Sequence, residues 1–245
     1  MADAFLERFV PGHSDGKPAN VPPSVLPSVL QCPALLEFEW LDHAFGTRHT
    51  GDWLAAHPAL TLRQIHSNVV FRSDGLTNRQ CEGDALISNE IGRRIGVRTA
   101  DCVPILIADA RTRAIAAVHA GWRGTASRVA RAAVEKMAAE FGSQPEDLHA
   151  AMGPAIRECC YEVGAEVARE LAPLFPEWRA EEKNGKRHID LVEANRRVLR
   201  EAGVAASRIY DCGRCTYCEP ELFFSYRREP ANPGRMVSSI VRVAE

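Results

Sequence analysis

Apolar residues in the first half of the chain form short runs that are separated by polar turns. Residues 60–71 (LTLRQIHSNVVF), 83–88 (GDALIS), 103–109 (VPILIAD) and 114–120 (AIAAVHA) have the length and composition of strands. We expect the run 103–109 to be a buried strand, with Asp101 and Cys102 at its start. The first half of the chain therefore predicts a sheet.

The period of the pattern changes after this region. In residues 126–142 (ASRVARAAVEKMAAEFG) the apolar residues recur every three or four positions, at Val129, Ala133, Met137 and Phe141. That spacing places them on one face of a helix, and Gly142 is typical of the residue that ends one. We expect a long amphipathic helix here.

The second half mixes both periods. Residues 148–153 (LHAAMG) predict a strand, and residues 162–175 predict a helix with Val163, Val167 and Leu171 on one face. Asn184 and Gly185 are typical of a hairpin turn.

The last part of the chain continues this mixture. Asp190 is placed as the N-cap of a helix that Gly203 ends. Residues 222–245 predict one aromatic and one β-branched strand around a turn.

Strands and helices in this order favour an α+β fold without internal repeats. The chain has 245 residues, a length that one large domain can occupy. Residues 11–33 contain six of the 15 prolines and show no sustained period. We therefore expect a proline-rich N-terminal arm at 1–33 and one folded domain at 34–245.

Charge and cysteine content limit the classes of partner and chemistry that the sequence favours. The net charge of -2 and the charged fraction of 25% favour a small or neutral partner over nucleic acid or a membrane surface. No apolar run reaches the roughly 18 residues of a membrane span, and the N-terminus lacks a signal-like pattern, so we expect a cytoplasmic protein. The eight cysteines do not have the dense spacing of a disulfide scaffold, which favours reduced thiols or metal chemistry.

Three residues beside turns or strand ends can bind a metal: His66, Cys102 and His119. One thiolate and two imidazoles match a catalytic zinc site, in which a water takes the fourth position with its pKa lowered to about 7. Taken singly, a cysteine there is more often a small buried apolar residue, and a histidine more often a hydrogen-bonded structural one.

The segment after His119 (HAGWRGTASR) predicts an anion-binding turn. Gly121 and Gly124 lie around a tight turn, and the N-terminus of the following helix points back toward His119. Arg123 and Arg48 are candidates to bind a phosphate or carboxylate, although either can be a solvated surface charge.

Two carboxylates also lie next to apolar strands. Asp84 and Asp101 can fix an imidazole tautomer or move a proton, and the alternative for both is N-capping or turn formation.

A further set of cysteines has metal-ligand spacing. Cys212, Cys215 and Cys218 form a C-x2-C-x2-C motif, which can start an iron-sulfur or a zinc site, but a fourth ligand is missing in sequence. A second metal is expected there only if Cys159 or Cys160 folds against the motif. Otherwise these residues are inert thiols.

Together these segments resemble a known family. The segments similar to motifs of the YfiH-type laccase-domain family are RQIHS, GDALIS, TADCVPILIAD, AAVHAGWRGT, GPAIRECCYEVG, HIDLVEANRRVL and CTYCEPELFFSYRRE, followed by GRMVSSI. They occur in the expected order from about Phe45 to Ile240. The sequence departs from the family pattern at Arg98, where an apolar or small residue is usual, and at FGTRHTGD, where a glycine-richer turn is usual.

The resemblance implies one α+β domain of mixed sheets sandwiched by helices, in α/β/β/α layers. It also implies a Zn²⁺ site at His66, Cys102 and His119, with Cu²⁺ as the alternative. The family is associated with purine nucleoside phosphorylase activity on adenosine, inosine and methylthioadenosine, and with adenosine deaminase activity. The same resemblance implies polyphenol oxidase or peptidoglycan-editing activity as alternatives.

We therefore expect a zinc-dependent purine nucleoside phosphorylase that binds a nucleoside and phosphate and is a monomer or homodimer. Asp84, Asp101 and Cys102 are the candidate catalytic residues, and Arg48, Arg123, Gly121 and Gly124 the candidate phosphate-binding residues.

Three alternatives remain. The first is a copper oxidase with Met152 as axial ligand. The second is a hydrolase with Cys102 as nucleophile and His119 as base. The third is a binding module that holds a structural ion.

Overall fold

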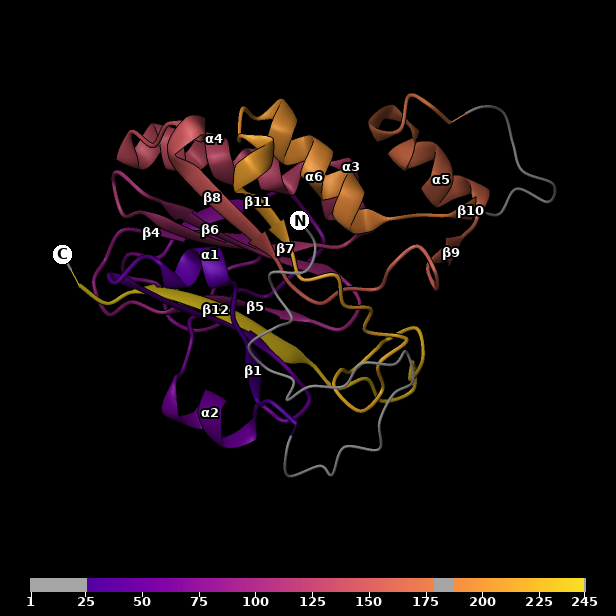
Figure 1. The fold of residues 1–245 in the computed structure, drawn as a ribbon, viewed down its shortest axis with the longest axis horizontal. Helices are drawn as coiled ribbons and strands as arrows, with labels where there is room; N and C mark the ends of the chain where they lie inside the picture. The colour runs from indigo at the N-terminus through magenta and orange to yellow at the C-terminus, as the bar shows by residue number, and fades with distance from the viewer. Residues whose placement is uncertain (1–25, 179–186, 245) are drawn as a thin grey trace.

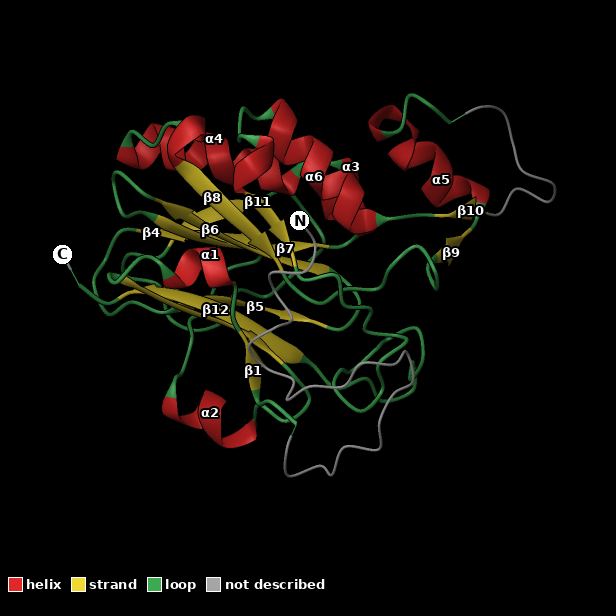
Figure 2. Ribbon diagram, in the orientation of Figure 1, coloured by secondary structure: helices red, strands yellow, loops and turns green. Residues whose placement is uncertain are grey.

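The computed structural model describes residues 26–178 and 187–244. Two sheets lie face to face, and helices cover the outer face of the larger sheet (Figure 1). A short helix lies beyond the smaller sheet (Figure 2). The predicted α+β class with mixed sheets and helical outer layers is confirmed.

The larger sheet has six strands in the order β11-β8-β6-β7-β4-β3. Its strands are β3 (Val70–Arg72), β4 (Ala85–Ser88), β6 (Val103–Asp109), β7 (Ile115–Ala120), β8 (Leu148–Met152) and β11 (Ile209–Asp211). The four central strands are antiparallel, and the outer pairs β11–β8 and β3–β4 are parallel.

The smaller sheet has four antiparallel strands in the order β1-β2-β12-β5. They are β1 (Val29–Leu30), β2 (Leu41–Gly46), β5 (Ile95–Thr99) and β12 (Met236–Arg242). A separate antiparallel pair is formed by β9 (Glu162–Val163) and β10 (Arg187–His188).

Helices α4 and α6 pack on the outer face of the larger sheet (Figure 2). The helices are α1 (Pro33–Leu36), α2 (Gly51–Ala56), α3 (Trp122–Ala126), α4 (Val129–Phe141), α5 (Ala165–Leu171) and α6 (Leu191–Glu201). The 3-10 helices are η3 (Pro145–Asp147), η4 (Ala172–Leu174) and η5 (Ala206–Arg208). No helix among the described residues is both long and apolar enough to cross a membrane.

Strand β6 shows why the apolar run of the sequence is continuous. Ile105 and Ile107 point into the core beneath the helices, whereas Leu106 and Ala108 point into the core between the two sheets. Successive side chains of a strand alternate between its faces, so a strand covered on both sides needs apolar residues at every position. This arrangement fixes β6, and the turn that precedes it, between two packed layers.

Several predicted local features are confirmed. Val129, Ala133 and Met137 are buried on one face of α4, and Gly142 follows that helix with φ 68° and donates its N–H to the carbonyl of Ala138. The Asp190 side chain accepts hydrogen bonds from two backbone N–H groups in the first turn of α6.

The helix predicted from residue 126 begins later. Helix α3 ends at Ala126, Arg128 adopts a left-handed conformation with φ 60°, and α4 starts at Val129. Arg128 thus separates two helices where the sequence pattern predicted one.

Two predicted elements are shorter than expected, and a third is absent. Of residues 60–71, only Val70 and Phe71 lie in a named strand, while Leu60 and Arg63 form isolated bridges. The predicted helix 162–175 starts at Ala165, because Glu162–Val163 pairs as β9 instead. The predicted aromatic strand is wrong, since Leu222 and Phe223 donate to the carbonyl of Glu219 in turns.

The predicted N-terminal arm falls largely outside the described residues, as does the predicted Asn184–Gly185 turn. Packed structure is present before the predicted boundary at Ala34, because β1 pairs with β2 and the Leu30 side chain is buried. The division at Ala34 stays a prediction.

Candidate metal centre and cavity

Three separate segments bring His66, Cys102 and His119 together at one end of the two sheets. His66 lies in the loop before β3, Cys102 in the turn between β5 and β6, and His119 on β7. One ligand atom from each residue lies within 4.8 Å of the others, and the two imidazole rings are 4.9 Å apart between centroids. These are possible metal-binding residues, as the sequence suggested.

Asp84 orients His119. The Nδ1 atom of His119 is 2.8 Å from Oδ1 of Asp84, and the backbone N–H of His119 donates to the carbonyl of Asp84 at 2.7 Å. Both side chains are buried. Because the carboxylate occupies Nδ1, it is Nε2 that is left to bind a metal or a proton.

The same carboxylate holds the turn that carries His66. Its oxygens accept hydrogen bonds from the backbone N–H of His66 at 3.0 Å and from the N–H and hydroxyl of Ser67 at 2.6 and 2.7 Å. These contacts stabilise the left-handed backbone of His66, whose φ is 61°. Burial raises the pKa of Asp84, but the hydrogen bonds from His119 and Ser67 outweigh it and lower that pKa to about 2.

Cys102 and His119 form a strongly polarised pair. Burial raises the pKa of Cys102, yet the charges and hydrogen bonds of His119 and His66 lower it to about 6. Burial lowers the pKa of His119, while Cys102 and Asp84 raise it to about 9. The surroundings therefore favour a thiolate beside a protonated imidazole, and a metal ion bound here would take the place of that proton on His119.

Gly121 follows His119 by two residues and lies against the cluster. A Cβ atom at this position would be 2.6 Å from Nδ1 of His66 and 3.0 Å from Sγ of Cys102. No larger residue fits without moving a ligand, so this glycine is required by a close approach. Gly124 has a weaker constraint, since its Cβ would be 3.3 Å from the carbonyl of Ser67.

Asp101 is buried and its carboxylate is occupied by three donors. It accepts from the hydroxyl of Thr216 at 2.6 Å, the hydroxyl of Ser225 at 3.0 Å and the backbone N–H of Arg227 at 2.7 Å. These bonds hold Asp101 in a left-handed conformation with φ 86° directly before Cys102. The geometry favours positioning of Cys102 over proton transfer.

The cluster opens into a cavity of about 650 Å³. Its charged lining includes Asp101 and five arginines: Arg79, Arg98, Arg123, Arg227 and Arg235. None of the five pairs with a carboxylate among the described residues. Burial, together with the charges of Arg79 and Arg235, lowers the pKa of Arg98. The wall is therefore positively charged and suited to an anion.

Aromatic side chains line the same cavity. Trp122, Tyr161 and Tyr226 are part of its wall, and the guanidinium of Arg123 lies 4.2 Å from the ring centre of Trp122. The cavity thus combines cationic groups with flat apolar faces.

Arg48 is not part of this lining. Its side chain donates to the carbonyl of Pro220, lies 3.9 Å from a carboxylate oxygen of Glu229 and stacks over Phe224. The structure therefore brings Arg123 to the predicted anion site but directs Arg48 elsewhere. The helix predicted to point its N-terminus at the site is the five-residue α3.

Sequence reasoning missed four of the five arginines. Arg98 carried a signal, because it departs from the family pattern. Arg79 lies outside the family motifs, and Arg227 and Arg235 lie in the last two motifs, where nothing connected them with anion binding. Their convergence depends on loops that are distant in the sequence.

Comparison with known proteins identifies relatives along most of the chain. A family model described as multi-copper polyphenol oxidoreductase laccase matches residues 47–243. The chain is 44% identical over 163 residues to a protein named adenosine deaminase RL5 from an unknown prokaryotic organism, an alignment that covers 65% of this chain and 62% of that protein. It is 44% identical over 183 residues to a purine nucleoside phosphorylase of Deinococcus radiodurans, with 74% and 69% covered.

Solved structures agree with this relationship. The chain resembles YlmD from Geobacillus stearothermophilus with a TM-score of 0.78 and 30% identity, covering 89% of this chain and 97% of that one. It resembles the hypothetical protein YfiH of Bacillus licheniformis with a TM-score of 0.77 and 27% identity, covering 88% and 97%.

Proposed function

The chain belongs to the YfiH/YlmD family of laccase-domain proteins, and on this basis we propose that it is a zinc-dependent purine nucleoside phosphorylase acting on adenosine, inosine and methylthioadenosine. The observation that carries the proposal is the position of His66, Cys102 and His119 at the wall of an arginine-lined cavity. A possible metal-binding cluster and an anion-binding wall share one space there, so that a metal-polarised nucleoside and a phosphate could be bound side by side.

The donor set suits zinc. One thiolate and two imidazoles from the protein match zinc sites that keep a position for a reactant, whereas structural zinc normally has four protein ligands. The side of the cluster formed by His66 is exposed, while His119 is buried. When bound, zinc would supply Lewis-acid polarisation to a group of the substrate.

The chain's own residues account for substrate binding. The arginines attract and orient phosphate, with Arg98 and Arg123 the two that we assign to it. Trp122, Tyr161 and Tyr226 offer faces on which a purine base can stack. We assign Asp84 and Asp101 to positioning of His119 and Cys102, because all their close contacts are with donors of the protein.

Adenosine deamination is a second candidate activity, supported by the relative named adenosine deaminase. It would use the same metal-binding residues on the same nucleoside without phosphate.

Copper oxidation has less support. Met152, the suggested axial ligand, is buried in the core beneath the helices and does not line the cavity. A second alternative, a hydrolase with Cys102 as nucleophile, is supported by the polarised Cys102–His119 pair and differs from the proposal in needing no metal.

The test is product analysis with zinc-loaded protein. Adenosine with phosphate is expected to give adenine and ribose 1-phosphate, and inosine and methylthioadenosine to give the corresponding bases. Omission of phosphate should abolish base release, while inosine and ammonia formed from adenosine would report deamination.

A chelator and two variants complete the experiment. Chelation and Cys102→Ala should both abolish turnover, and Cys81→Ser, a half-buried cysteine outside the cavity lining, should leave it unchanged. Activity that survives chelation would contradict a zinc enzyme and support a thiol nucleophile.

A further inference from the structure

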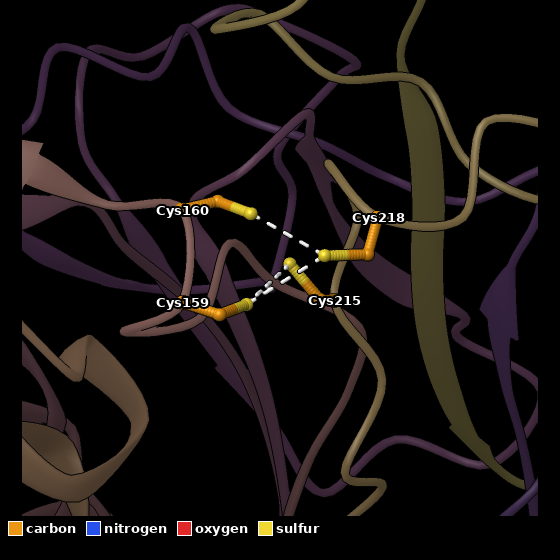
Figure 3. Close-up of side chains that lie close together, drawn as sticks. All are labelled: Cys159, Cys160, Cys215 and Cys218. Atoms are coloured by element: carbon orange, nitrogen blue, oxygen red, sulfur yellow. Dashed lines mark hydrogen bonds between the residues drawn. The ribbon is translucent and has the colours of Figure 1, made fainter.

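A second cluster of thiols lies outside the site described above. The structure folds Cys159 and Cys160 against Cys215 and Cys218, so that their four sulfur atoms all lie within 4.8 Å of one another (Figure 3). Cys212, the first cysteine of the C-x2-C-x2-C motif, is not a member, because its side chain is buried in the core between the sheets. The motif therefore supplies two of the four sulfur atoms, and the adjacent pair Cys159 and Cys160 supplies the other two.

The sulfur separations match those around a single ion. Sγ of Cys159 is 3.7 Å from that of Cys215 and 3.6 Å from that of Cys218, and Sγ of Cys160 is 3.3 Å from that of Cys218. Four thiolates placed tetrahedrally at about 2.3 Å from zinc would be about 3.8 Å apart. All four cysteines are free thiols, so no disulfide accounts for their proximity. We propose that Cys159, Cys160, Cys215 and Cys218 bind one zinc ion as a four-thiolate structural site.

The two ligand-bearing loops are held together by backbone contacts. Ala155 and Cys215 form an isolated parallel bridge, and the N–H of Thr216 donates to the carbonyl of Ala155 at 3.1 Å. Cys160 donates its backbone N–H to the carbonyl of Arg157 in the turn that presents the adjacent pair. The ligands are therefore brought together by the fold and not by flexible side chains alone.

Backbone N–H groups converge on the sulfur of Cys215. Burial raises its pKa, but backbone N–H groups of Arg157, Cys218 and Tyr217 that are directed at its sulfur lower the pKa overall. Hydrogen bonds from residues two and three positions later are what a C-x2-C turn provides to a metal-bound sulfur.

The environment of Cys159 and Cys160 disfavours their thiolate forms in the absence of a cation. Burial and the neighbouring thiols of Cys218 and Cys215 raise the pKa of Cys159 to about 11, and burial with Cys218 and Cys159 raises that of Cys160. A divalent ion removes this mutual repulsion, and the displaced protons pass to solvent.

The proposed ion would support the cavity wall. Thr216, which lies between Cys215 and Cys218, donates its hydroxyl to Asp101, and the N–H of Ile156 donates to the carbonyl of Asp101 at 3.0 Å. Both loops of the thiolate site thus contact the residue before Cys102. The ion would fix the conformation of these loops, and four protein ligands leave it no position for a substrate.

The test counts metal in the full-length protein and does not depend on activity. Wild-type protein reconstituted with zinc and freed of excess ion is expected to contain two equivalents per chain. His66→Ala should lose one equivalent and Cys218→Ser should lose the other, while Cys81→Ser should retain both.

The His66→Ala variant also provides a spectroscopic readout that keeps the thiolate site intact. Loaded with Co²⁺ alone, it should show the intense sulfur-to-cobalt charge-transfer absorption of a four-thiolate site, and that absorption should be strongly reduced when Cys159→Ser is added. This second measurement holds even if Cys218→Ser fails to fold.

Two results would overturn the proposal. One is a single zinc equivalent in wild-type protein that His66→Ala removes completely. The other is a mass deficit in protein purified without reductant that maps to a disulfide among these four cysteines. Neither result bears on the phosphorylase proposal, which requires only the first site.

Discussion

Oδ1 of Asp84 lies 2.8 Å from Nδ1 of His119, and the same carboxylate also accepts the backbone N–H groups of the turn that carries His66. One buried carboxylate therefore orients two of the three candidate metal ligands. Removal of this carboxylate should therefore weaken metal binding directly, in addition to any loss of folding stability.

Asp84→Asn is expected to weaken zinc binding by about 10- to 100-fold, the usual effect of removing a partner that orients a ligand. A chelator competition measures the affinity directly. Asp109→Asn is the matched control, since Asp109 is a buried carboxylate that caps a turn at the far end of β6. Equal losses of affinity in both variants would show that the effect is general destabilisation.

Gly121→Ala should displace a ligand without unfolding the chain. The added Cβ would lie 2.6 Å from Nδ1 of His66, so we expect zinc binding at this site to weaken at least about tenfold. Gly164→Ala is a close control, because Gly164 is also a helix N-cap with nearly the same backbone angles and has nothing within 4 Å of its Cβ position. Unchanged zinc affinity in Gly121→Ala would contradict the described geometry.

Arg123→Ala is expected to raise the KM for phosphate by about tenfold, the order of one hydrogen bond to a charged group at an exposed position. The KM for the nucleoside should change less. Arg131→Ala is the control, because Arg131 is an exposed helical arginine paired with Glu135 and lies outside the cavity lining.

Arg48→Ala tests whether Arg48 binds phosphate, as the sequence suggested, or has a structural role, as its contacts indicate. Since Arg48 contacts Pro220, Glu229 and Phe224, we expect its removal to reduce stability and to change the phosphate KM less than Arg123→Ala does. If Arg48→Ala raised the KM for phosphate more than Arg123→Ala does, Arg48 would have to be assigned to phosphate binding.

The free energy of unfolding should decrease as the pH is lowered from neutral to acid, partly because of His43. Nε2 of this buried side chain accepts a hydrogen bond from the backbone N–H of Cys32. Burial lowers the pKa of His43 to about 4; the charge of Asp42 opposes this shift and that of Arg94 adds to it. The unfolded chain takes up the proton near its ordinary pKa of about 6.5 and the folded chain only near pH 4, so stability is present above that range and is lost as the pH falls through it.

The expected loss from His43 is about 2 kcal/mol of unfolding free energy between pH 7.5 and pH 5. Urea unfolding at the two pH values measures it. His43→Gln, which cannot take up a proton, should show a smaller difference between the two. An identical pH dependence in both proteins would mean that other groups determine the acid sensitivity.

Much of the fold was predictable because its local signals agree with the tertiary structure. The apolar run of β6, the spacing of Val129, Ala133 and Met137, and the Asp190 cap each depend on neighbours in the sequence. Residues 222–226 were not predictable in this way. Their aromatic composition is typical of a strand, but the hydroxyl of Ser225 bonds to Asp101, which lies more than one hundred residues away.

The candidate site shows the same division. His66, Cys102 and His119 are recognisable because each is a metal-binding side chain at the end of an apolar segment. Arg79, Arg227 and Arg235 have no such signal, since an isolated arginine in a loop has the same local pattern whether it faces solvent or a shared cavity. The thiol cluster was predictable in part. The spacing of Cys215 and Cys218 is visible in the sequence, but only the structure shows that Cys159 and Cys160 lie against them.

Cys102 lies where the chain leaves the smaller sheet at β5 and enters the larger sheet at β6. A residue at such a crossing is brought to its final place only when both sheets have docked, and its imidazole partners come from a loop and a strand on either side of it in the sequence. We therefore expect the three-ligand cluster to assemble late in folding, so that an ion bound there would be acquired after the two sheets have formed rather than act as a folding nucleus.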